Sequence, residues 1–185
     1  MSDRPSTAWI APNATVVGDV TIGSESSIWY GAVVRADAAP IHIGTRTNVQ
    51  DNCVLHADPG FPLTIGNNTT LGHVAICHGA TIGDGVLVGM GAVVMNGARI
   101  GDGSLIAAGA VVLESTHIPP RSLVAGVPAK VIRPVTDAEA AALLDNARNY
   151  AALAQQHKAN EFAHLKEPVS SQQEVAGPSL SSSSI

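Results

Sequence analysis

An aliphatic residue recurs at every sixth position over most of this 185-residue chain, and this period restricts the fold more than any other feature. The period begins near Ile22 and runs unbroken from Ile76 to Val124. An α-helix needs apolar residues three and four positions apart, and a meander of hairpins needs longer strands with turns about every 8–12 residues. The spacing instead predicts short strands that are separated by tight corners and that each direct one aliphatic side chain into a thin core.

Glycine follows the aliphatic residue in many units, often with Asp or Asn behind it, as in "IGDG" at residues 82–85 and 100–103. Such residues tolerate the positive φ of tight corners. The pattern predicts an all-β domain, a parallel β-helix whose coils stack about 4.8 Å apart. It resembles the hexapeptide-repeat proteins. This resemblance implies a left-handed helix with three hexads in each triangular coil, and therefore about seven coils in this chain.

The predicted organisation has four parts. Thr136 and Glu139 form a capping box, and an apolar stripe that includes Leu143, Ala147 and Tyr150 indicates a helix behind it. The parts are a flexible N-terminus at residues 1–8, the β-helix domain at 9–135, a C-terminal helix packed on the coils at 136–166, and a disordered Ser-rich tail at 167–185.

Composition excludes several classes of function. Apolar residues make up 45% of the chain but aromatic residues only 3%, so Ile, Val, Leu and Ala must fill the core. A formal net charge of −5 provides no basic surface for nucleic acid or an anionic membrane. The sequence shows neither a signal peptide nor an apolar run near the ~18 residues of a membrane span, so we expect a cytoplasmic protein. Two cysteines, Cys53 and Cys77, are too few for a disulfide framework.

The coil length predicts where three histidines lie relative to one another on the prism. His56 and His78 are 22 residues apart, which is one coil of 18 residues plus a short insertion within residues 57–62. They should stack on one edge of the prism, one coil apart. His73 lies five residues before His78 and should point from a different edge. In a trimer of parallel prisms, different edges of neighbouring subunits face each other, so His73 of one chain can meet His56 and His78 of the next.

Three imidazoles that leave a fourth tetrahedral position to water are the ligand set of a catalytic zinc ion. The spacing therefore predicts a metal site shared between the subunits of a homotrimer. Zn²⁺ is the expected metal, with Co²⁺ or Fe²⁺ as alternatives. The alternative interpretation is that each of the three histidines is a separate surface or hydrogen-bonded residue. This is also the interpretation of the single histidines His42, His117, His157 and His164.

Three stretches are similar to the γ-class carbonic anhydrase family, namely "RADAAPIHIGTRTNVQDNCVLH", "LGHVAICHGATIGDGVLVGMGAVVMNGARIGDGSLIAAGAVV" and "IPPRSLVAGVPAKVIRPV". The resemblance covers about residues 10–160. It implies that His56, His73 and His78 are metal ligands, with His73 contributed across the subunit boundary. It also implies an enzyme, a lyase that reversibly hydrates CO₂ to bicarbonate by means of a metal-bound hydroxide.

The same resemblance implies site roles for Arg35, Asp37, Gln50, Asp51 and Tyr150. Arg35 and Asp37 match an Arg-Gly-Asp triplet with Ala36 in the glycine position, and Gln50 and Asp51 match a Gln-Asp pair. Gln50 would orient the metal-bound water, and Arg35 would pair with acidic groups at the trimer interface. Purely structural salt bridges are the alternative for the charged residues, and a place in the core is the alternative for Tyr150.

Two other functions stay open. The best-known γ-class enzyme releases protons through glutamates after its triplet and in a longer acidic loop, whereas this chain has Ala38 and the short loop "ADPGFP", whose sole acid is Asp58. Weak hydration, or a non-catalytic trimeric scaffold tied by the metal, is therefore one alternative. The other is a CoA-linked acyltransferase or thioesterase, because such enzymes also use the hexapeptide repeat.

Overall fold

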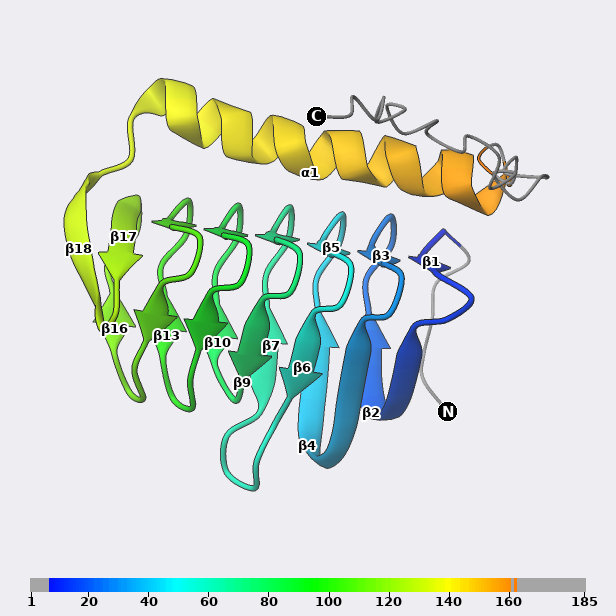
Figure 1. Cartoon of the computed structure of the whole chain (residues 1–185), viewed down its shortest axis with the longest axis horizontal. Helices are drawn as coiled ribbons and strands as arrows, with labels where there is room; N and C mark the ends of the chain where they lie inside the picture. The colour runs from blue at the N-terminus through cyan, green and yellow to red at the C-terminus, as the bar shows by residue number, and fades with distance from the viewer. Residues whose placement is uncertain (1–6, 161, 163–185) are drawn as a thin grey trace, which may run out of the picture.

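A computed structural model describes residues 7–160 and residue 162. Short strands stack into the three faces of a prism, and one long helix lies along its outside (Figure 1). This arrangement confirms the parallel β-helix and the C-terminal helix that the sequence predicts. The predicted serine-rich tail, the last residues of the predicted helix segment and most of the predicted N-terminal segment lie outside the described residues.

Two long strands, β2 (Thr15–Ile22) and β4 (Val33–Ile43), pair with each other and run along both the second and the third face. The first face contains β1 (Trp9–Ile10), β3 (Ser27–Ile28), β5 (Asn48–Val49), β8 (Thr70–Leu71), β11 (Leu87–Val88), β14 (Leu105–Ile106) and β17 (Ser122–Gly126), and antiparallel β18 (Ala129–Pro134) ends it. The second face adds β6 (Val54–His56), β9 (Ile76–His78), β12 (Val93–Val94) and β15 (Val111–Val112). The third adds β7 (Leu63–Ile65), β10 (Thr81–Ile82), β13 (Arg99–Ile100) and β16 (His117–Ile118).

The stack comprises about six turns, slightly fewer than the sequence period predicts. The predicted number assumes that every residue between about 15 and 135 belongs to a hexad. The hairpin of β17 with β18, the loop after His56 and the long strand β4 all use residues without adding a coil. The difference therefore lies in the connections and not in the repeat itself.

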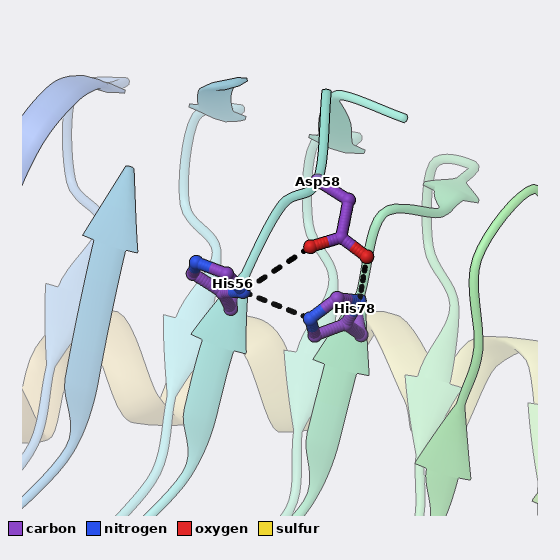
Figure 2. Close-up of side chains that lie close together, drawn as sticks. All are labelled: His56, Asp58 and His78. Atoms are coloured by element: carbon purple, nitrogen blue, oxygen red, sulfur yellow. Dashed lines mark hydrogen bonds and ion pairs between the residues drawn. The ribbon is translucent and has the colours of Figure 1, made fainter. Parts of the chain in front are cut away.

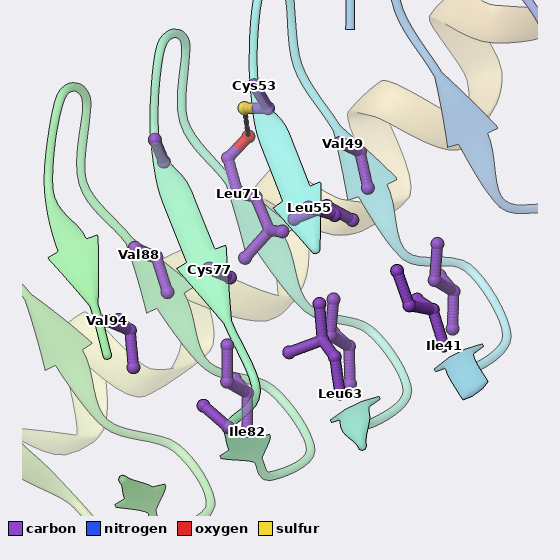
Figure 3. Packing of buried hydrophobic residues seen from close by; sticks show 14 of the residues in the cluster. Ile41, Val49, Cys53, Leu55, Leu63, Leu71, Cys77, Ile82, Val88 and Val94 are labelled. Atoms are coloured by element: carbon purple, nitrogen blue, oxygen red, sulfur yellow. Dashed lines mark hydrogen bonds between the residues drawn. The ribbon is translucent and has the colours of Figure 1, made fainter. Parts of the chain in front are cut away.

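The core is a column of stacked aliphatic side chains (Figure 3). Val49 lies beside Leu71 and Ile65 beside Ile82 in register, and all four side chains are buried. Burial of each such side chain contributes about 1.5–3 kcal/mol to folding. Cys53 and Cys77 are buried among them as free thiols, as expected for small apolar residues, and burial raises the pKa of the Cys53 thiol to about 12.

Helix α1 (Asp137–Lys158) begins over the last coil and ends over the first (Figure 1). Its first turn has the predicted capping box, because the Thr136 side chain accepts a hydrogen bond from the Glu139 backbone N–H and the Glu139 side chain accepts one from Thr136. Near its end, His157 Nδ1 lies 2.9 Å from the Tyr30 hydroxyl oxygen. The described residues contain no helix that is long and apolar enough to cross a bilayer. The cytoplasmic location stays a prediction.

Candidate metal centre

His56 and His78 occupy the same position in neighbouring coils of the second face. They end strands β6 and β9, which pair in parallel with these two residues in register. Nδ1 of His56 lies 2.8 Å from Nε2 of His78, and both rings are partly buried (Figure 2). The prediction that the two histidines stack on one edge, one coil apart, is confirmed.

The outer nitrogen of each ring already has a hydrogen-bond partner. His56 Nε2 lies 3.0 Å from Oδ1 of Asp37, and His78 Nδ1 lies 2.7 Å from Oδ1 of Asn96. Histidines that bind metals commonly donate their second N–H to a carboxylate or carbonyl oxygen, which fixes the ring and its tautomer. The two remaining nitrogens face each other, so this pair of residues fits a divalent cation.

Asp58 adds a carboxylate to the histidine pair. Its Oδ1 lies 4.0 Å from His56 Nδ1 and its Oδ2 lies 4.0 Å from His78 Nδ1 (Figure 2). One donor atom from each of the three residues lies within 4.8 Å of the others. Asn96 in turn donates from Nδ2 to Asp58 Oδ2 at 2.9 Å. Sequence reasoning missed Asn96, although its position 18 residues after His78, one coil on, is a usable signal.

His73 points from a different edge, at the corner between β8 and β9. Its Nδ1 lies 2.9 Å from Oδ2 of Asp51, and its side chain is 41% exposed. The corner is strained, because the β-branched Val74 has φ +63°. Within one chain, the cluster of possible ligands among the described residues is His56, Asp58 and His78, without His73. The separation of His73 from the other two agrees with the coil arithmetic.

Arg35 and Asp37 lie on β4, where Arg35 is in register with His56. Arg35 Nη1 pairs with Asp37 Oδ2 at 2.5 Å. The hydrogen bond from Arg35, followed by that from His56, lowers the pKa of the Asp37 carboxyl group below its usual value. Asp37 therefore stays ionised and holds His56 Nε2–H. Ala36 stands in the extended strand between them and requires no glycine conformation. The pairing of Arg35 with acidic groups of another subunit stays a prediction.

A cavity of about 480 Å³ between α1 and the first face brings Gln50, His73 and Tyr150 together. Gln50 is buried, donates from Nε2 to Asn48 Oδ1 at 3.1 Å, and accepts the His73 backbone N–H at 3.2 Å. Burial, with a smaller effect of the Asp51 charge, raises the pKa of Tyr150. The Tyr150 ring also packs edge-on against Trp29, with ring centroids 5.3 Å apart. Tyr150 thus both packs against the prism and lines the cavity.

The repeated coils define a hexapeptide-repeat protein, and residues 79–114 match the family described as "Bacterial transferase hexapeptide (six repeats)". The "Probable carbonic anhydrase" of Methanocaldococcus jannaschii is 51% identical over 146 residues, which cover 79% of this chain and 92% of that protein. "Gamma carbonic anhydrase 1, mitochondrial" of Arabidopsis thaliana is 42% identical over 85% of this chain, which spans 60% of that relative's length.

A solved structure, a "hexapeptide transferase family protein" of Anaplasma phagocytophilum, superposes with a TM-score of 0.81 and 42% identity, covering 84% of this chain and 92% of that one. The match to the Methanocaldococcus jannaschii protein covers nearly the whole length of that protein. The chain belongs to the γ-carbonic anhydrase family of hexapeptide-repeat proteins.

Proposed function

We propose that the protein catalyses the reversible hydration of CO₂ to bicarbonate at a metal site between the subunits of a homotrimer. The observation that carries this proposal is a hydrogen-bonding arrangement that three histidines share. Each has one ring nitrogen held by an oxygen acceptor, which leaves its other nitrogen for a cation. The pairs are His56 with Asp37, His73 with Asp51, and His78 with Asn96.

The donor set favours Zn²⁺, with Co²⁺ or Fe²⁺ as alternatives, and such a cation would supply an activated water at neutral pH. The cavity beside His73 suits an uncharged, apolar substrate, because Leu87, Met90 and Leu105 line it. The amide of Gln50 and the hydroxyl of Tyr150 are the polar groups that could orient bicarbonate oxygens there. Asp58 is 43% exposed beside the histidine pair and can pass a proton to solvent.

The second face supports the trimer. A ladder of outward-facing aliphatic residues crosses it in register, formed by Val33, Val54, Ile76, Val93 and Val111. Val54 is 40% and Ile76 36% exposed in the single chain. A continuous apolar row of this kind is typical of a subunit contact. His73 lies at the corner before strand β9 of this face, and His78 ends the same strand. A cyclic trimer can therefore place the His73 edge of one subunit against the His78 edge of the next.

Mixed trimers test whether the site is shared. His73→Ala and His78→Ala should each abolish zinc binding and CO₂ hydration. When the two variants are refolded together in equal amounts, every mixed trimer contains one complete site, so zinc content and rate should recover to about a quarter of the wild-type values. No recovery would reject the shared site. Retention of zinc by His73→Ala alone would show that His56, Asp58 and His78 hold the cation within one chain.

The two alternatives give different results in the same experiments. A wild-type protein that binds zinc but hydrates CO₂ no faster than buffer in stopped-flow measurements would be a metal-tied scaffold. The transferase names of the family match and of the Anaplasma relative keep the CoA-linked function as the second candidate. That function predicts transfer or hydrolysis of the acyl group of acetyl-CoA by protein that contains no metal.

A further inference from the structure

We infer that Asn96 is a positioning residue of the metal centre, which sets the tautomer of His78 and couples it to Asp58. The inference rests on the proposed function, since it concerns the same cation. Asn96 follows strand β12 in the coil next to that of His78, so its side chain reaches the ring from the neighbouring turn of the solenoid.

The hydrogen bonds determine which way the Asn96 amide points. The Asp58 carboxylate can only accept, so the group 2.9 Å from its Oδ2 is the amide nitrogen of Asn96. The amide oxygen is therefore the atom 2.7 Å from His78 Nδ1. Because an amide oxygen cannot donate, Nδ1 of His78 must carry the hydrogen. Its Nε2 then has the lone pair and faces His56 Nδ1 at 2.8 Å, which is the tautomer that metal ligation through Nε2 requires.

Gly79 makes room for this contact. It has φ +54°, and a Cβ atom built on it would overlap Oδ1 of Asn96. The corner is also held by backbone hydrogen bonds, from Gly97 N to Gly79 O at 2.7 Å and from Gly79 N to His56 O at 3.0 Å. Gly79, the residue after His78, thus leaves space for the side-chain oxygen of Asn96. Gly97, the residue after Asn96, is hydrogen-bonded to Gly79.

An asparagine with a structural role offers a matched control. Asn67 lies at another corner, where its Oδ1 accepts from Thr45 N at 2.8 Å and its Nδ2 donates to Asp84 at 3.2 Å. It has the same kind of links between coils as Asn96, but these hydrogen bonds join it to no histidine. Its replacement should weaken the fold without changing the metal centre.

The experiment measures zinc affinity by competition with a chelator, and the visible spectrum of the Co²⁺-loaded protein. Asn96→Leu, which neither donates nor accepts, should weaken zinc binding about 10–100-fold and shift the cobalt bands, whereas Asn67→Ala should lower the melting temperature alone. The double variant Asn96→Asp with Asp58→Asn exchanges the carboxylate and the amide. A carboxylate at position 96 then accepts from His78, and an amide at position 58 donates to that carboxylate. This exchange should recover most of the affinity.

Wild-type affinity and spectrum in Asn96→Leu would overturn the inference, as would an equal loss in Asn67→Ala or failure of the exchanged pair to recover. These outcomes leave the proposed function standing, because the wild type still binds zinc. A wild type without zinc affinity would instead overturn the proposed function, and this inference with it.

Discussion

Nε2 of His78 lies 2.8 Å from Nδ1 of His56 across one coil of the β-helix. Their ring centroids are 4.9 Å apart, which is the spacing of hydrogen-bonded strands. The parallel ladder itself therefore sets the separation of the two rings. A pair of imidazoles on such a rigid scaffold needs little rearrangement to bind one ion, which favours affinity.

Removal of either stacked histidine should remove the metal. We expect His56→Ala and His78→Ala to bind less than about a tenth of the zinc bound by the wild type, because loss of one of three ligands also leaves its carboxylate or amide partner unpaired. Metal analysis of the purified protein provides the measurement. His42→Ala is the control, since His42 is exposed on the third face in register with Thr64. Equal zinc loss in this control would contradict the assignment.

The aliphatic ladder on the second face should be required for assembly. Ile76→Asp places a charge in the middle of this ladder, where burial without a partner costs several kcal/mol, so trimers should dissociate to folded monomers. Sedimentation velocity will reveal the change, and zinc should be lost with it. Thr64→Asp introduces the same negative charge on the third face and should leave the trimer intact. A trimeric Ile76→Asp protein would exclude this face as the interface.

Tyr150→Phe tests the cavity role of the tyrosine hydroxyl. The ring should keep its edge-on contact with Trp29, so the melting temperature and zinc content should not change. We expect the rate of CO₂ hydration to fall by about 10-fold, which is less than the ~100-fold loss that follows removal of a hydrogen-bond donor to a developing charge. Because burial raises the pKa of Tyr150 above its ordinary value, the hydroxyl stays protonated at neutral pH and should introduce no pH dependence there. An unchanged rate would leave packing as the role of Tyr150.

The capping box should make the stability of helix α1 depend on pH. Hydrogen bonds from Arg133 and Thr136 lower the pKa of Glu139 from 4.5 to about 2. A carboxyl group whose pKa is lowered by folding stabilises the folded state above its unfolded pKa and loses this effect as the pH falls to its folded pKa. Glu139→Gln should therefore be less stable than the wild type in urea unfolding at neutral pH. The difference should shrink between pH 4.5 and 2. A constant difference across this range would contradict the assignment.

The repeat and the histidine stack could be predicted because a solenoid is nearly one-dimensional. A fixed number of residues per coil converts sequence separation into position on a face, which is why Ile82 and Ile100, 18 residues apart, are in register. His56 and His78 are also in register, because the insertion after His56 adds the residues by which their separation exceeds one coil. The same rule predicted that His73 points from another edge. The coil number was slightly overestimated because the period does not show where strand β4 lengthens or where β18 turns back on β17.

The amino-acid sequence by itself determined the β-helix, its aliphatic core and the order in which the histidines meet its edges, since these follow from a period and a coil length. Only the tertiary structure decided which atoms hold the rings. The contacts of Asn96 with His78, of Asp51 with His73, and of α1 with the cavity beside Gln50 depend on side-chain rotamers and on how one helix lies across several coils. Those are set by neighbours from other turns of the chain, so the coil period can place Asn96 one coil from His78 but cannot show which atoms make contact.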